Sequence, residues 1–182
     1  MLPRDDIPVE YVQKILDYDP ITGFFTWKYR EDDRGNFNAR FPGKRAGFVE
    51  PSNGGYIRIV FNRRFYLAHR LAWAVHYGSI PPQSYIDHID LNRTNNAISN
   101  LRICTPSENA ANQCGHKDSV TGIKGVTIRK KTGTYVATIT VNGKQIYLGD
   151  YPSIKEASDK YDEASLKYFG SFARFNLIGE SK

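Results

Sequence analysis

The chain has 182 residues, enough for one or two small domains, and 40% of them are hydrophobic, a proportion that suits a folded protein. No apolar run approaches the length needed to cross a bilayer, and the start Met-Leu-Pro-Arg-Asp-Asp lacks the apolar core of a signal peptide. We therefore expect a protein that is cytoplasmic or is released into the cytoplasm of a host. The net charge of +6 suggests a polyanionic partner without proving one.

The charge is unevenly spread along the chain. Residues 1–33 hold eight acids and four bases, residues 34–121 hold eleven bases and five acids, and residues 122–149 hold five bases and no acid. A basic surface is therefore expected in the middle and C-terminal parts of the chain, where a polyanion would lie.

Periodicity and turn residues predict short helices and strands in the N-terminal part. Helices are expected over residues 8–18 and 68–77, with a turn at 19–23 after the first and Gly78 ending the second. Strands are expected over residues 24–28, 46–50, 56–61 and 64–67, the last two joined as a hairpin.

Two basic groups in this part leave alternatives open. Residues 31–44 lack periodicity and are expected to form a loop, in which Arg34, Arg40 and Lys44, with Arg45 behind them, either contact phosphates or are simply solvated. His69-Arg70, at the start of the second helix, either completes the buried core or contacts phosphate.

The stretch from residue 85 to 112 is predicted to form a strand, a polar loop, a second strand and a helix. The loop over 90–99 is rich in Asn, and Thr105-Pro106-Ser107 is a helix start signal. The residues that could carry chemistry are, in chain order, Asp87, His88, Asn100 and Asn109.

This block resembles the ββα-metal motif of HNH endonucleases, and within them the homing endonucleases of mobile introns and bacteriophages. His88, Asn100 and Asn109 fall on the three letters of that name, and the likeness extends upstream through His69-Arg70 to Asp17-Tyr18-Asp19-Pro20. The resemblance implies an α+β fold and metal-dependent hydrolysis of DNA phosphodiester bonds. It also implies that Asn100, counted here with the catalytic set, fixes the loop rather than binding metal.

The residue types suit that chemistry. One hard divalent cation can neutralise phosphoryl charge and stabilise the departing 3′ oxygen, and Asp87 and Asn109 offer oxygen ligands for it. We expect Mg²⁺, with Mn²⁺ as a substitute. His88, with an ordinary pKa of about 6.5, can accept a proton from the attacking water at neutral pH.

An alternative to the hard-cation site is a zinc site formed by cysteine and histidine side chains. Cys104, Cys114, His88 and His116 could bind zinc, but no Cys-x-x-Cys pair is present and the spacing fits no common zinc template. We therefore expect no structural zinc, and two free thiols in a reducing cytoplasm.

The C-terminal part is predicted to form a three-stranded antiparallel sheet backed by one helix. Strands are expected over 125–129, 134–141 and 144–148, and a capping box at Ser153 and Glu156 begins a helix that ends at Gly170. Alternation places one apolar set toward the helix: Val126, Ile128, Ala137, Ile139, Val141, Ile146 and Leu148. The acids of residues 122–176 all lie at Asp150 or later, so the helix side is expected to be acidic and the open face basic and polar.

Residues 122–176 resemble the ethylene-response-factor (APETALA-type) DNA-binding domain, through Lys124-Gly125-Val126 and the run from Tyr147 to Tyr151, among others. Such domains lay their sheet in the major groove. In the plant domains several Arg and Trp occupy the open face, whereas Thr, Gln and Tyr predominate here, so base preference does not transfer. Across the whole chain the predicted DNA contacts are His69, Arg70, Arg93, Arg102, Lys124, Thr127, Arg129, Lys130, Lys131, Thr138, Thr140, Lys144, Gln145 and Tyr147.

The sequence thus predicts a nuclease domain over 1–116, a linker over 117–121, a DNA-binding domain over 122–176 and a tail over 177–182. The partner is expected to be double-stranded DNA, and the protein is expected to be a monomer that nicks one strand. The rival hypothesis is a DNA-binding protein whose nuclease motif has degenerated, although all four motif residues are intact.

Overall fold

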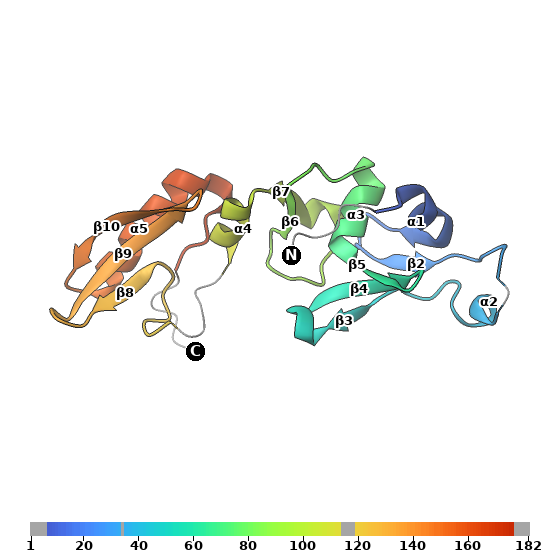
Figure 1. Ribbon diagram of the computed structural model, residues 1–182, viewed down its shortest axis with the longest axis horizontal. Helices are drawn as coiled ribbons and strands as arrows, with labels where there is room; N and C mark the ends of the chain where they lie inside the picture. Colours follow the sequence, from blue (N-terminus) through green and yellow to red (C-terminus); the bar gives the residue numbers. More distant parts are fainter. Residues whose placement is uncertain (1–6, 34, 114–118, 177–182) are drawn as a thin grey trace. The chain divides into compact units, whose positions relative to one another are not determined.

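The structure, a computed structural model, describes residues 7–33, 35–113 and 119–176. It forms two compact units, Met1–Ile103 and Cys104–Lys182, and each is taken by itself below (Figure 1). Both mix helices with small sheets, so the predicted α+β class is confirmed. No helix in the described ranges is long and apolar enough to span a membrane.

The described residues of the first unit form three small sheets and three α-helices. The helices are α1 (Val9–Ile15), α2 (Phe37–Arg40) and α3 (Ala68–Tyr77). The sheets pair β1 (Leu16–Tyr18) with β2 (Phe25–Trp27), β3 (Phe48–Glu50) with β4 (Tyr56–Phe61) and β5 (Arg64–Leu67), and β6 (Tyr85–His88) with β7 (Leu101–Cys104). Short 3-10 turns occupy Pro51–Asn53 and Ile98–Asn100.

One apolar core holds this unit together. Val12 of α1, Ile59 of β4 and Leu71 of α3 are fully buried in it, and Ile86 of β6 joins the same cluster. Figure 1 shows α3 lying against β4 and β5, the sheet that supports it. The strand carrying Asp87 and His88 is therefore anchored in the same core as α3.

The predicted helix over 8–18 is too long. The helix ends at Ile15, and Leu16–Tyr18 instead form strand β1, in which Leu16 pairs with Trp27 and Tyr18 with Phe25. The cause is the turn at Asp19–Gly23, which reverses the direction of the chain. In this turn the Gly23 N–H donates to the Asp19 carbonyl, and the Asp19 carboxylate accepts from the Thr22 hydroxyl. A hairpin closed by such a turn pairs the residues that precede it.

The region predicted as a loop over 31–44 contains the short helix α2. Asn38 orders it by bonding both the N–H and the carbonyl of Arg30, and the guanidinium of Arg30 lies 3.7 Å from the Phe37 ring centre. Arg45, one of the possible phosphate contacts, stacks over Phe24 at 3.6 Å. Arg34 lies outside the described residues.

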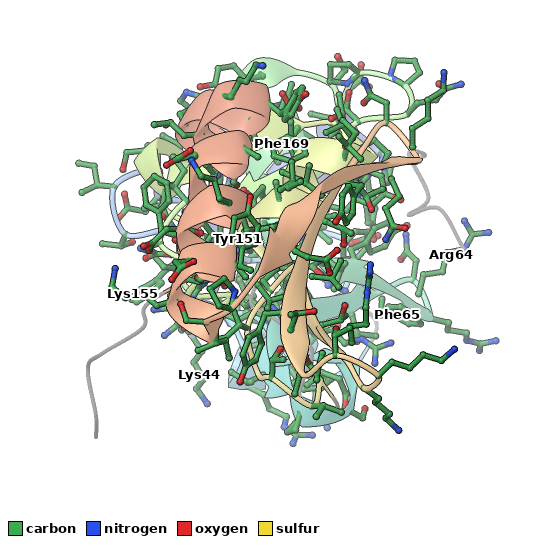
Figure 2. The ribbon with its side chains drawn as sticks, turned by 90° about the vertical axis from the view of Figure 1, so that its left-hand side faces the viewer. Lys44, Arg64, Phe65, Tyr151, Lys155 and Phe169 are labelled. Carbon is green, nitrogen blue, oxygen red and sulfur yellow. The ribbon has the colours of Figure 1, made fainter. Side chains whose placement is uncertain are left out.

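The second unit is a three-stranded sheet covered by one long helix. Its elements are α4 (Pro106–Asn112), β8 (Val126–Arg129), β9 (Thr134–Val141), β10 (Lys144–Tyr151), α5 (Ile154–Phe169) and a 3-10 turn at Gly170–Phe172. The strand order is β10-β9-β8, all antiparallel, and α5 runs along one face, as Figure 1 shows. Lys155, in the first turn of α5, points away from the sheet and pairs with Asp159 (Figure 2).

The apolar face of the sheet packs on α5 as the alternation predicts. Val126, Ala137 and Ile139 are buried there, and the backbone at Gly125 comes so close that a Cβ would overlap the ring of Tyr161. Ile128 departs from the prediction, since 39% of it is exposed. Figure 2 shows Phe169, from the last turn of α5, which closes the end of this core.

Strand β10 is longer than predicted and contains a bulge. Its pairing with β9 shifts between Tyr147 and Gly149, after which Asp150 stands opposite Val136. A bulge inserts one extra residue and inverts the alternation beyond it. The predicted capping box at Ser153 is half formed: Ser153 Oγ accepts from the Glu156 N–H at 3.2 Å, while the Glu156 carboxylate bonds the Ser153 hydroxyl.

Helix α4 packs with the second unit. Ala111 shares a core cluster with Ile139 and Tyr161, and a complete capping box, Thr105 with Glu108, begins the helix. The division between the units falls at Ile103 and Cys104, so the block predicted over 85–112 is divided between them. Part of the predicted linker, residues 117–118, lies outside the described residues, as do Cys114 and His116 of the zinc alternative.

Candidate active site

Strand β6 carries Asp87 and His88 into the first unit. Both are buried, with 8% and 3% of their surface exposed. Arg102 stands on the neighbouring strand β7, and its Nε and Nη2 each lie 3.0 Å from Oδ2 of Asp87. Arg102 was predicted to contact DNA, but in this structure its charge is directed at the carboxylate of Asp87.

The imidazole of His88 is held by a buried asparagine. Its Nε2 lies 3.0 Å from Oδ1 of Asn96, and its ring meets the ring of His69 edge-on at 5.0 Å. Burial lowers the pKa of His88 below its ordinary value of 6.5, while the contact with Asn96 and the charge of Asp87 oppose that shift. The neutral ring is thus favoured at neutral pH, as a proton acceptor requires.

A network around Asn100 fixes the loop between β6 and β7. The Asn100 amide donates to Asp90 Oδ1 and to the Asn95 carbonyl, both at 2.8 Å, and its Oδ1 accepts from the Asp90 N–H at 3.0 Å. Burial acts to raise the pKa of Asp90, but the hydrogen bonds from Asn95 and Asn100 outweigh it and hold that pKa below its ordinary value. An ionised Asp90 therefore anchors the loop beside His88.

His69 and Arg70, in the first turn of α3, are buried. Only 5% of His69 and 4% of Arg70 is exposed, so both side chains lie within the fold, as His88 does. The His69 ring lies 5.0 Å from Tyr56 as well as from His88, and within the described residues its Nδ1 has no hydrogen-bond partner. Burial holds the pKa of His69 well below 6.5, and the charges of His88 and Arg70 act in the same direction.

Arg93 is the exposed cation of this loop. Its Nη1 donates to the Gly54 carbonyl at 2.6 Å, and its guanidinium lies 4.9 Å from the Tyr56 ring centre. The sequence interpretation missed Asn96 and Tyr56. The doublet Asn95-Asn96 reads as a solvated loop, and a tyrosine that begins a strand carries no distinguishing signal.

The proposed metal ligands have hard oxygen donors. Asp87 offers a carboxylate, and Asn109, half-buried on α4 of the second unit, offers an amide oxygen. Within the described part of the chain, no three His, Cys, Asp or Glu side chains come together as a metal cluster. Each of the two residues offers an oxygen donor, the type of ligand that a hard divalent cation prefers.

The open face of the second unit's sheet carries most of the remaining predicted DNA contacts. Thr138 is half-buried, and the exposed members of the set are Thr127, Arg129, Lys130, Lys131, Thr140, Lys144, Gln145 and Tyr147. Because of the bulge in β10, Asp150 lies on the same open face of the sheet. Asp150 lies 3.1 Å from Arg129 and accepts a 2.5 Å hydrogen bond from Tyr147, which raises the pKa of Tyr147.

Lys124, one of the predicted DNA contacts, bonds to backbone carbonyls of its own unit. Its Nζ donates to the carbonyls of Ala110, Ala111 and Gln113 at 2.5–2.9 Å. These are carbonyls at the C-terminal end of α4, where a cation compensates the helix dipole. Lys124 therefore caps a helix.

Comparisons with known proteins agree with the position of this site. Residues 66–111 match the family model described as HNH endonuclease, and this segment contains α3, β6, β7 and the first part of α4. Protein 3.8 of Escherichia phage T7 is 34% identical over 116 residues, which cover 62% of this chain and 95% of that protein.

Further relatives cover smaller parts. The uncharacterized HNH endonuclease L560 of Acanthamoeba polyphaga mimivirus is 36% identical over 56% of this chain, and the chain spans about half (51%) of its length. The AP2-like ethylene-responsive transcription factor TOE2 of Arabidopsis thaliana is 33% identical over 64 residues, 35% of this chain and 13% of that protein. The solved structure of the HNH homing endonuclease I-HmuI aligns over 98% of this chain and all of its own, at 21% identity and a TM-score of 0.43.

The matched segment begins two residues before α3 and ends beyond Asn109, so it contains Asp87, His88, Asn100 and Asn109, the four residues of the predicted motif. The predicted resemblance to HNH endonucleases is therefore confirmed for residues 66–111, which match the model of that family, and a relative named as an HNH endonuclease is similar to the chain.

Proposed function

We propose that the protein is a metal-dependent endonuclease of the homing type that hydrolyses phosphodiester bonds of double-stranded DNA in the cytoplasm of a bacterial or phage-infected cell. The observation that carries the proposal is the setting of His88: a buried imidazole with a lowered pKa, next to Asp87 on one strand and bonded to Asn96 of the loop that Asn100 fixes. These residues lie inside the matched HNH segment.

In the proposed reaction His88 is the catalytic base and accepts a proton from the water that attacks phosphorus. Asn100 fixes the loop through Asp90 and the Asn95 carbonyl, which keeps the imidazole in place. Arg102 holds the carboxylate of Asp87 in one orientation. The chemistry proceeds without a covalent enzyme intermediate, and the products would carry 5′-phosphate and 3′-hydroxyl ends.

HNH nucleases generally use a divalent metal ion, and here Asp87 and Asn109 would hold it, with Mg²⁺ favoured and Mn²⁺ as a substitute. Such an ion supplies charge neutralisation at the phosphoryl oxygens and at the departing 3′ oxygen. Both donors are oxygen atoms, which favours a hard cation over zinc.

DNA binding is assigned to both parts of the chain. Residues 1–116 would engage the scissile phosphate and residues 122–176 would add affinity as an APETALA-type module. The exposed bases Lys130, Lys131 and Lys144 support the second role, whereas the ion pair between Asp150 and Arg129 lowers the positive potential of the sheet. We therefore propose a module that adds affinity more than tight sequence preference.

Incubating the protein with supercoiled plasmid and Mg²⁺, with and without EDTA, tests the proposal. Cleavage that requires Mg²⁺, stops with EDTA and is absent in His88→Ala supports it. Retarded plasmid mobility without any cleavage, in Mg²⁺ or in Mn²⁺, would establish the rival function, a DNA-binding protein with a degenerate nuclease motif.

A further inference from the structure

The turn between β1 and β2 contacts the loop that holds His88. The Tyr18 hydroxyl donates to the Asn96 carbonyl at 2.8 Å, and the Ile98 N–H donates to the Pro20 carbonyl at 3.0 Å. At Gly23 the two backbones come so close that a Cβ would overlap the peptide joining Asn96 to Ala97. Three independent contacts therefore fix the backbone at residues 96–98.

These contacts give a role to residues 17–20, which have no part in the proposed catalysis. The resemblance to the nuclease family reaches upstream to Asp17-Tyr18-Asp19-Pro20, far from any catalytic residue in sequence. In the structure Asp19 shapes the turn by accepting from the Ile21 N–H and the Thr22 hydroxyl, at 2.9 and 2.7 Å. The turn so formed presents Tyr18, Pro20 and Gly23 to the active-site loop.

Asn96 is placed at a cost to stability. Only 1% of Asn96 is exposed, less than of any other buried polar residue described in the first unit. Within the described residues its Nδ2 has no hydrogen-bond partner. A buried donor without a partner lowers the free energy of unfolding. An apolar side chain at position 96 would avoid this loss of stability. We therefore look for a functional reason in the contact between Asn96 Oδ1 and His88.

The chemistry of the contact determines where the proton lies. An amide oxygen only accepts, so the hydrogen between Asn96 Oδ1 and His88 Nε2 belongs to the ring, and the lone pair of the neutral imidazole is on Nδ1. We propose that Asn96, clamped by the Tyr18–Gly23 turn, is a positioning residue that holds His88 in the Nε2–H tautomer. Nδ1 is then the nitrogen that accepts the proton of the attacking water. The proton transfer rests on the proposed function, whereas the tautomer is a property of the free protein.

The tautomer can be read by NMR without any cleavage. Long-range ¹H–¹⁵N correlations of the histidine side chains of the ¹⁵N-labelled full chain, recorded at about pH 8 where histidine is neutral, distinguish the two forms. The His88→Gln variant assigns the signals. The expected result is an Nε2–H tautomer at His88 in the native protein. An Nδ1–H tautomer, or a mixture of the two forms, would overturn the inference.

Variants test what holds the tautomer. Asn96→Ala should give a mixture of forms, Asn96→Asp, which keeps an acceptor oxygen, should retain the Nε2–H form, and Tyr18→Phe should shift the population in part. Tyr11→Phe is the matched control, because it removes a hydroxyl of the same unit whose partner is Asn62. An unchanged Nε2–H preference in folded Asn96→Ala contradicts the role of Asn96. If that variant does not fold, Tyr18→Phe decides the clamp: spectra identical to those of the native protein contradict it.

Cleavage assays separate this inference from the proposed function. Asn96→Ala should lower kcat by about 10–100-fold, as loss of an orienting partner typically does, with a much smaller change in KM. Should the native protein fail to cleave DNA, the proposed function fails while the tautomer measurement still stands. Cleavage by a native protein with His88 in the Nδ1–H form would leave the function intact and remove the role of Asn96.

Discussion

Arg102 directs two nitrogens, Nε and Nη2, at one oxygen of Asp87, each at 3.0 Å. The side chains of Asp87 and Arg102 are 9% and 16% exposed, so the pair is largely shielded from water. The arrangement fixes the orientation of a carboxylate that we propose as a metal ligand. It also gives Arg102, one of the predicted DNA contacts, a partner within the protein.

Removing Arg102 should therefore destabilise the protein. Arg102→Ala removes a cation that is paired with the buried Asp87 carboxylate, and the free energy of unfolding should fall by about 3–5 kcal/mol. Urea denaturation measures it. Arg129→Ala is the matched control, because its pair with Asp150 is exposed, at 49% and 29%, and should contribute less than about 1 kcal/mol. Equal losses in the two variants would show that burial of the Asp87 pair has no energetic weight.

Replacing His88 should abolish turnover and spare binding. The His88→Ala variant loses the proton acceptor, so kcat should fall by about 10²–10⁴-fold while DNA affinity stays nearly unchanged. Plasmid cleavage and fluorescence anisotropy measure the two effects. His76→Ala, an exposed histidine of α3, is the control and should cleave normally. If His88→Ala cleaved at a near-native rate while His69→Ala did not cleave, the base would be assigned to the wrong histidine.

Stability should decrease as the pH falls below about 6.5. In the folded protein burial holds the pKa of His69 well below 6.5, whereas the unfolded chain titrates near 6.5. The unfolded state thus binds an extra proton first, so the contribution of His69 is fully present above that pH and is lost as the pH falls toward the folded pKa. Urea denaturation across this range measures the slope.

The His69→Gln variant should flatten that pH dependence without removing it, because the pKa of His88 is lowered too and contributes with the same sign. A slope identical to that of the native protein would mean that His69 is protonated to the same extent in both states.

The exposed lysines of the second unit should determine the salt dependence of DNA binding. Each of Lys130→Ala, Lys131→Ala and Lys144→Ala that removes a phosphate contact should reduce the slope of log K against log salt by about 0.9. Lys124→Ala is the control, since Lys124 caps α4 and should affect stability while leaving the slope unchanged. The opposite pattern, a change with Lys124 alone, would place the DNA on another surface.

Local patterns predicted the elements whose signals are local. Strand β4, helix α3 and helix α5 lie within a residue of their predicted bounds, because alternation, helical periodicity and a glycine stop are each written in a short window. Strand β1 was missed because Leu16–Tyr18 continue the apolar spacing of α1, and only pairing with β2 separates them. The bulge at Leu148 leaves no periodic signal, so the position of Asp150 could not be foreseen.

The site shows the same division. The motif residues were identified from their spacing, but the partners that orient them are set by contacts between distant segments. Asn96 meets Tyr18 across 78 positions, and Arg93 meets Gly54 across 39. A basic residue in a basic chain reads as a DNA contact, and only the fold shows that Arg102 pairs with Asp87 and that Lys124 caps a helix.

The final prediction concerns the number of strands cut. The chain contains one HNH segment, residues 66–111, and one catalytic site engages one scissile phosphate at a time. The two strands of a duplex run antiparallel, so cutting both requires a twofold dimer or a large reorientation on the DNA. We expect a monomer whose first product from supercoiled plasmid is the open circle. A cleavage time course beside a sizing experiment on the free protein measures this. Linear DNA as the first product, at protein concentrations where sizing gives a dimer, would replace the monomeric nickase with a symmetric pair of sites.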